Sequence, residues 1–189
     1  MIMALPKQIW GLDPKTGQQR WFVRNTLEGS QIPTPVIVDN VAYVHGGGPR
    51  SSGSLAVRLG GQGDVTDTHV LWSSKAVSSP PSPVLLDDLL YWVNGSGKAC
   101  CADARTGELR YEEALPGGGR FAVYASVVAA EGRLYAVMRK GGTVVLAAQP
   151  EFRILAHNKL ASDESDFNGS PAIANGQLFL RSDRYLYCF

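Results

Sequence analysis

Short apolar runs separated by turn residues recur along this chain, and no segment sustains the 3.6-residue period of an amphipathic helix. In one example, residues 83–86 lead into the turn pair Asp87-Asp88, and residues 89–93 form a continuous apolar run. Apolar runs of this length, bounded by turn residues, are typical of strands that are buried on both faces. The pattern therefore predicts an all-β chain of short antiparallel strands with essentially no long helix.

The same hairpin returns four times along the sequence. Its second strand carries an aromatic residue at Tyr43, Tyr91, Tyr135 and Phe179, spaced 48, 44 and 44 residues apart. A hydroxyl residue opens each repeat, at Thr34, Ser82, Ser126 and Ser170. Because one small sheet cannot bury both of its faces, a period of this length predicts a β-propeller whose four-stranded antiparallel blades stack on one another.

Turn residues support the register of these repeats. The inner hairpins turn at Asp39-Asn40, Asp87-Asp88, Glu131-Gly132 and Asn175-Gly176. Asn, Asp and Gly tolerate the positive φ values of tight hairpin turns. We therefore expect a two-residue hairpin turn at all four places.

A second motif lies between the third strand and the outer strand of a blade. Residues 13–21 read DPKTGQQRW, and residues 103–111 read DARTGELRY. The Asp is expected to accept hydrogen bonds from turn amides, the Gly supplies backbone freedom, and the aromatic residue packs against the adjacent blade. We expect seven residues of this motif to be structural: Asp13, Gly17, Trp21, Trp72, Asp103, Gly107 and Tyr111.

The repeats divide the single domain, residues 1–189, into five parts. Residues 1–28 are expected to supply the last two strands of a blade, because residues 8–13 align with residues 98–103. Three complete blades follow, at residues 29–77, 78–117 and 118–162, and residues 163–189 give three strands of a final blade. About four blades per chain would be half of an eight-bladed ring. Whether the chain is a natural protein, a fragment or an engineered half stays open.

Charge and composition exclude several classes of function. The chain has 18 Lys and Arg against 17 Asp and Glu, so no basic surface for nucleic acid is expected. No apolar run approaches the roughly 20 residues that span a bilayer. The first eight residues do not resemble a secretory signal. Three cysteines do not make a disulfide framework.

The Asp-x-x-Thr-Gly-x-x-x-Trp pattern, with Ser-Pro-Val before the inner hairpin, resembles the PQQ-like repeat β-propellers. That family includes quinoprotein alcohol dehydrogenases and a propeller lipoprotein of the outer-membrane β-barrel assembly machinery. Residues 63–72 and 180–188 look most like uncharacterised bacterial members of the second kind. The resemblance implies blades of this type, commonly eight to a ring, and a periplasmic or cell-envelope location. It implies little about activity, because the repeat motif is structural.

Candidate chemical groups are sparse. Cys100-Cys101 could form the adjacent-cysteine disulfide of some quinoproteins, but strand neighbours point to opposite faces, which favours two buried thiols. His45, His69 and His157 are far apart in the sequence and lack the spacing of zinc ligands. The acidic stretch 163–166 is interpreted as a solvated loop rather than a metal site. We therefore assign no catalytic, cofactor-binding or metal-binding residues, and we expect no cofactor.

The sequence favours a non-catalytic propeller that acts as a scaffold or protein-interaction module for an unknown protein partner. The alternative is a fragment of a quinone-dependent alcohol or sugar dehydrogenase. We also expect a homodimer that completes the ring, in which Gln19 to Arg24 of each copy adds the missing outer strand to the final blade of the other. The competing expectation is a monomer that closes on itself with the same strand.

Overall fold

The computed structural model describes residues 1–27, 31–48, 51–76 and 78–189. These residues form five small β-sheets, and their single helix, α1 (Thr66–His69), has four residues. The all-β prediction is confirmed. The chain divides into two compact units, Met1–Ser79 with Asp103–Glu108, and Pro80–Ala102 with Leu109–Phe189.

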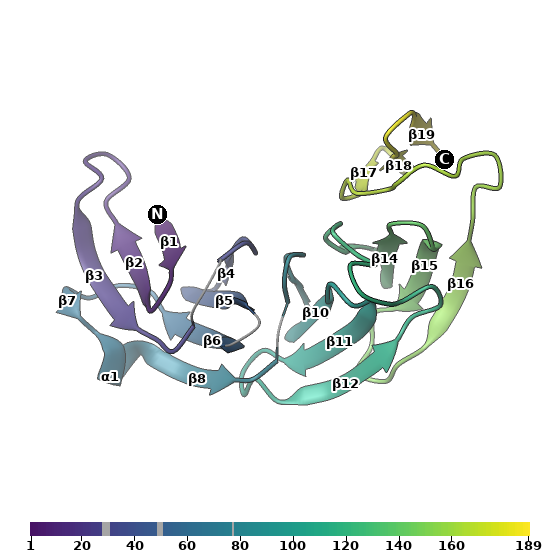
Figure 1. Cartoon of the computed structure of the whole chain (residues 1–189). Coiled ribbons are helices and arrows are strands. Elements are labelled where there is room, and N and C mark those ends of the chain that lie inside the picture. The colour runs from purple at the N-terminus through teal and green to yellow at the C-terminus, as the bar shows by residue number, and fades with distance from the viewer. Residues whose placement is uncertain (28–30, 49–50, 77) are drawn as a thin grey trace. The chain divides into compact units, whose positions relative to one another are not determined.

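The first unit contains two four-stranded sheets (Figure 1). One has the order β1-β2-β3-β7, built from β1 (Ile2–Leu5), β2 (Gln8–Leu12), β3 (Gln19–Arg24) and β7 (Gly63–Asp64). The other has the order β4-β5-β6-β8, built from β4 (Val36–Val38), β5 (Val41–Gly48), β6 (Ser51–Arg58) and β8 (Val70–Ser74). Neighbouring strands are antiparallel except for β3 and β7, which run parallel. A core around Ile9, Trp21, Val44 and Val57 lies between the two sheets.

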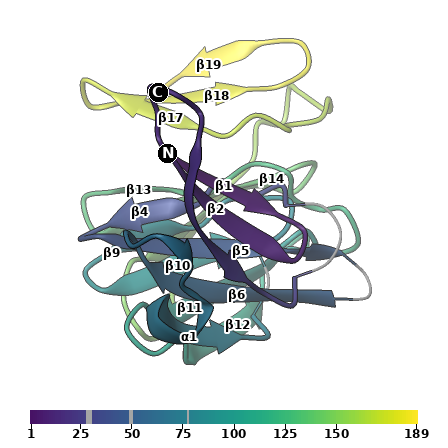
Figure 2. The same cartoon turned by 90° about the vertical axis from the view of Figure 1, so that its left-hand side faces the viewer.

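The second unit contains two four-stranded antiparallel sheets and a three-stranded one. The first is formed by β9 (Val84–Leu86), β10 (Leu89–Val93), β11 (Lys98–Asp103) and β12 (Leu109–Ala114). The next is formed by β13 (Val128–Ala130), β14 (Arg133–Met138), β15 (Gly142–Ala147) and β16 (Ile154–Asn158). The last contains β17 (Ala172–Ala174), β18 (Gln177–Arg181) and β19 (Leu186–Cys188), which run side by side in Figure 2.

The hairpin turns follow the sequence prediction. All four turn pairs adopt positive φ, from +47° at Asp39 to +74° at Gly176. Each pair joins two antiparallel strands at the end of their register, as Val38 and Val41 are joined in the first complete repeat. The local chemistry of Asp, Asn and Gly therefore favours these turns, and Glu131, at a φ of +50° before Gly132, is the one other residue type among them.

The N-terminal sheet has more strands than the sequence analysis assigned to residues 1–28. Residues Ile2–Leu5 form β1 and pair antiparallel with β2, where only β2 and β3 were expected. The outer edge of β3 is also occupied, because Trp21 and Phe22 pair with Gly63 and Asp64 of β7. Arg24 adds an ion pair with Asp64 at 2.8 Å. The strand expected to be donated to a second copy is thus paired on both sides within its own chain.

Hydroxyl side chains link successive sheets of the second unit. The Ser82 amide donates to Ser126 Oγ at 2.9 Å, and the Ser126 amide donates to Ser170 Oγ at the same distance. These serines open the repeats found in the sequence. In the second unit the repeated serine therefore provides a hydrogen bond between successive sheets, just before their first strands.

Candidate functional site

Both Asp-x-x-Thr-Gly turns use their side chains to close the turn. Asp13 Oδ1 accepts from the amides of Lys15 and Thr16 at 2.8 and 3.3 Å, and Asp13 Oδ2 accepts from Arg20 at 2.7 Å. The hydrogen bond from Arg20 is the main reason that the pKa of Asp13 lies below its usual value. Gly17 has a φ of +72°, and its amide donates to the Asp13 carbonyl.

The second turn repeats this arrangement. Asp103 Oδ1 accepts from Arg105 and Thr106 amides at 2.9 and 3.1 Å, and Gly107 has a φ of +74°. The ring of Trp72 lies directly against this turn. Its Nε1 donates to the Ala104 carbonyl at 2.8 Å, and a Cβ added at Gly107 would lie 2.5 Å from Trp72 Cε3. Gly107 thus provides both a positive φ and room for an indole ring.

The other two aromatic residues of the motif are also packed. Trp21 is 5% exposed and lies over Gly11, where an added Cβ would be 2.0 Å from the indole. Tyr111 is 9% exposed and meets the edge of the Phe152 ring at a centroid distance of 5.5 Å. The contacts of these side chains fit a packing role.

The remaining candidates from the sequence do not assemble into a reactive centre. Cys100 and Cys101 are buried and are not joined in a disulfide, and burial raises the pKa of Cys100 to about 12. Burial also lowers the pKa of His45 to about 3. His69 lies in α1 and His157 lies in β16. No group of three or more His, Cys, Asp or Glu residues that could hold a metal ion occurs among the described residues.

A shared irregularity shows which outer-strand residues are equivalent. In each four-stranded repeat the register shifts just after one third-strand residue, namely Gly11, Ala56, Cys101 or Val145. The outer-strand residues paired with these four are Trp21, Trp72, Tyr111 and Ala156. The position that holds an aromatic ring in three sheets therefore holds a methyl group in the fourth.

The face that carries Ala156 borders a groove between the last two sheets. Tyr135 and Val145, which share its cross-strand row, line an apolar cavity of about 300 Å³ with Leu178, Leu180 and Phe189. Tyr135 is half-buried, whereas the equivalent Tyr91 is 1% exposed. The sheet β13–β16 therefore lacks the filled packing that the preceding sheet has.

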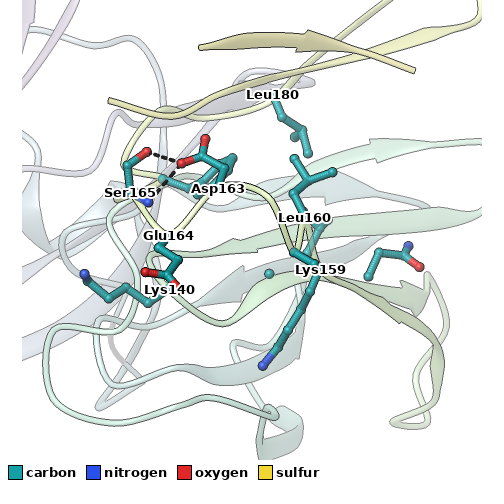
Figure 3. A pocket seen from close by; sticks show the side chains of 12 residues that line it. Lys140, Lys159, Leu160, Asp163, Glu164, Ser165 and Leu180 are labelled. Carbon is teal, nitrogen blue, oxygen red and sulfur yellow. Dashed lines mark hydrogen bonds between the residues drawn. The ribbon is translucent and has the colours of Figure 1, made fainter. Parts of the chain in front are cut away.

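A second, more polar cavity of about 520 Å³ adjoins the first and shares Thr143, Asn158, Lys159, Leu160 and Leu180 with it. Lys140, Asp163 and Glu164 also line it. Leu160 and Leu180 point toward one another across it in Figure 3. Together the two cavities form one groove, which we call the β16–β18 groove, with an apolar end and a charged end.

One wall of the groove is fixed by a buried carboxylate. Asp163 is 8% exposed and accepts hydrogen bonds from Ser165 N at 2.9 Å, Ser165 Oγ at 2.6 Å and Tyr187 Oη at 2.8 Å (Figure 3 shows the two from Ser165). The hydrogen bond from the Ser165 hydroxyl, followed by that from Ser182, holds the pKa of Asp163 well below its usual range. Desolvation and the bond to Asp163 raise the pKa of Tyr187 to about 12.

Residues 163–166 therefore differ from the expected solvated loop. Asp163 is buried, and Asp166 forms ion pairs with Arg139 at 2.6 Å and with Lys140 at 3.2 Å. The hydrogen bond from Lys140 is the largest cause that lowers the pKa of Asp166. Arg139 lies 27 residues away from Asp166 in sequence, so no local pattern could reveal the pair. The stretch ties the last sheet to the one before it.

Comparisons with known proteins agree with this architecture. No family model and no curated protein matches the chain. Among solved structures, BamB from Moraxella catarrhalis matches with a TM-score of 0.72 and 17% identity, over 96% of this chain and 52% of BamB. The computationally designed Ika4 protein matches with a TM-score of 0.60 and 11% identity, over 92% of this chain and 98% of Ika4.

A europium-containing methanol dehydrogenase also matches, with a TM-score of 0.47 and 11% identity over 64% of this chain and 24% of the enzyme, which is too weak a likeness to bear on function. This chain spans about half the length of the BamB chain. At these identities the likeness shows the fold alone. The fold that this chain shares with BamB is the PQQ-like β-propeller.

Proposed function

We propose that this protein is a non-catalytic PQQ-like β-propeller that acts as a scaffold or protein-interaction module, and that the β16–β18 groove is its protein-binding site. The observation that carries the proposal is the apolar cavity on the face where Ala156 replaces the aromatic residue of the other sheets. Its volume of about 300 Å³ fits one large side chain. An exposed apolar recess with a polar neighbour is typical of a site that accepts an anchor residue of a partner.

The chemistry of the groove defines the partner. The apolar end, lined by Tyr135, Leu178 and Phe189, would take an aromatic or large aliphatic side chain. The other end places Lys140 and Lys159 near Asp163 and Glu164, so it would take polar or charged flanking residues. Asp163 is already engaged by its own hydrogen bonds and helps to keep the groove in shape. An extended segment with one apolar anchor is therefore the expected ligand.

The proposal also includes a location for the protein. The described residues contain no helix that is long and apolar enough to cross a membrane. A periplasmic or cell-envelope location is proposed from the resemblance to BamB. The alternative function, a fragment of a quinone-dependent dehydrogenase, is an outcome of the test below.

The test uses the substitution Ala156→Trp, which restores an aromatic side chain at the equivalent position. Linear peptides displayed on phage are selected on the wild-type protein and on the variant. We expect enrichment of peptides with an aromatic or large aliphatic residue, and loss of their binding on Ala156→Trp. Leu155→Trp is the matched control, because Leu155 lies next to Ala156 on the same strand and is 42% exposed.

Two results would overturn the proposal. One is a set of peptides that bind Ala156→Trp as well as the wild-type protein, or no enrichment at all. The other is bound pyrroloquinoline quinone, seen as its absorbance on the protein together with a raised melting temperature after addition of the quinone with calcium. That second result would favour the dehydrogenase alternative.

A further inference from the structure

The last sheet leaves exposed an apolar face that the sheet β9–β12 buries. Leu178 and Leu180 of β18 point toward the preceding sheet, because they pack with Val137 and line the groove. Strand alternation places Phe179 on the opposite face, in a row with Ala172 and Cys188. We call this the β17–β19 outer face. Cys188 is exposed, whereas the equivalent residues Ala56 and Cys101 are each 0% exposed.

The N-terminal sheet also exposes an apolar face, on the side turned away from the core of the first unit. Its strands direct Ile9, Trp21 and Val23 into the core of the first unit. Alternation therefore places Met3, Trp10 and Phe22, which form one cross-strand row, on the other side. We call this the β1–β3 outer face. Met3 is 39% exposed, and Trp10 and Phe22 are half-buried.

The contact between two internal sheets provides a template for how such faces meet. Tyr91 and Cys101 of one sheet pack in a single core with Leu134, Val144 and Leu146 of the next. Phe179 and Cys188 occupy the positions of Tyr91 and Cys101. On the N-terminal sheet, Trp10 and Leu12 occupy the positions of Val144 and Leu146, because they flank the residue before the register shift.

The side chains of the two outer faces are also complementary in size. Around Phe179, the β17–β19 outer face carries small residues, Ala172, Ala174 and Cys188. The β1–β3 outer face carries the large side chains of Met3, Trp10 and Phe22. Large side chains packed on a flat surface of small ones make a close contact, and contact removes apolar area of both from water.

We propose that a second copy of this chain covers these faces, so that the β17–β19 outer face of each copy packs on the β1–β3 outer face of the other. One chain carries both halves of the contact, and the contact repeats one that the chain already makes internally. Two copies related by a two-fold axis would bury both pairs of faces at once and leave neither exposed. Stacking of faces replaces the strand exchange expected from the sequence, because β3 is already paired with β2 and β7.

This proposal goes beyond the proposed function and uses other surfaces than the β16–β18 groove. Either proposal can be wrong without the other. Ala156→Trp fills the groove and leaves both outer faces unchanged, whereas disruption of the outer faces leaves the groove intact in each chain.

Cys188 supplies a site-specific test, since Cys100 and Cys101 are buried. In a Leu12→Cys variant, mild oxidation should join the introduced thiol of one copy to Cys188 of the other. We expect a non-reducing electrophoresis band at twice the 20.3 kDa of one chain, and a solution mass of the same size before oxidation. Adding Cys188→Ser should abolish the band. Phe121→Cys, at a residue that is 55% exposed outside both faces, is the control that should not be cross-linked.

A second variant pair tests the contact without cysteine chemistry. Cys188→Asp places a charge on the β17–β19 outer face and should halve the solution mass, with the far-ultraviolet spectrum unchanged because the side chain is exposed in the single chain. Phe121→Asp should leave the mass as it is. A wild-type mass of one chain at micromolar concentration, a disulfide formed within one chain, or a ladder of larger species would each overturn the two-copy assembly.

Discussion

Two neighbouring contacts in the second unit are made by equivalent faces of four-stranded sheets, one against a four-stranded and one against a three-stranded neighbour, and they differ in how they are filled. Between β9–β12 and β13–β16, Tyr111 of the outer strand joins a continuous core with Val144 and Leu146, and its ring meets Phe152. Between β13–β16 and β17–β19, the outer strand offers Ala156, the core is small, and two adjoining cavities remain. The filled contact therefore has an aromatic residue on the outer strand, and the open contact has a methyl group at that position.

The last strand shows a partial compensation for the missing ring. Phe189 stands at the position that Ala102 holds in an earlier repeat, since it follows the residue equivalent to Cys101. It is 56% exposed and lines the apolar cavity without closing it. The large side chain thus lies on the facing strand, where it narrows the apolar cavity but does not close it. The groove is therefore formed by the two sheets together.

Removing an aromatic residue from a filled contact should have the largest effect. Trp21→Ala would leave a hollow over Gly11 in the core shared with Val44 and Val57. We expect a loss of about 3–5 kcal/mol in the free energy of unfolding, measured by urea titration. The control is Leu71→Ala, at a residue that is 42% exposed, which should change stability by roughly 0.5 kcal/mol or less. Equal midpoints for Trp21→Ala and the wild type would show that the ring does not hold the sheets together.

Two glycine variants distinguish the loss of stability caused by overlap with an aromatic ring from the loss caused by backbone strain. Gly17 and Gly107 have φ values of +72° and +74°, and only Gly107 has a ring against it. Gly17→Ala should cost about 1–2 kcal/mol from the left-handed backbone alone. Gly107→Ala should cost about 1–3 kcal/mol more, because the new Cβ overlaps Trp72. Equal losses of stability for the two variants would mean that Trp72 moves aside at no cost.

The sequence predicted what depends on local chemistry. The turn pairs at residues 39–40, 87–88, 131–132 and 175–176 have the expected positive φ, because Asp, Asn and Gly, which fill all of these positions except Glu131, tolerate it in tight turns. The motif pairs Asp13 with Gly17 and Asp103 with Gly107 for the same reason. Strand β1 was missed, because residues 2–5 carry no copy of the repeated hairpin and their turn uses Lys7 at a φ of +66°.

The candidate site depended on information that the sequence does not carry locally. The absence of an aromatic residue in residues 154–158 was visible, but the cavity exists only because Leu178, Leu180 and Phe189 of another sheet face it. Asp163 was interpreted as solvated because its donors Ser182 and Tyr187 are distant in the chain. The count of about four blades and the half-ring remain predictions. Repeat patterns thus predict the sheets better than the surfaces between them.

The smallest expected effect concerns Asp163, in one wall of the β16–β18 groove, and appears only when the pH is lowered. The folded protein holds the pKa of Asp163 below the usual Asp value, so the carboxylate stabilises the fold wherever the unfolded chain would also be ionised. Below about pH 4 the unfolded chain binds a proton first, and this contribution falls as the pH drops toward the folded pKa.

Asp163→Asn removes the titrating group. The difference in urea midpoint between the wild type and Asp163→Asn should therefore be constant from neutral pH to about pH 5 and shrink below about pH 4. Glu164→Gln, at an exposed neighbour that lines the same cavity, is the matched control and should follow the wild type. A difference that stays constant down to about pH 3 would show that the hydrogen bonds from Ser165, Ser182 and Tyr187 do not favour the ionised carboxylate.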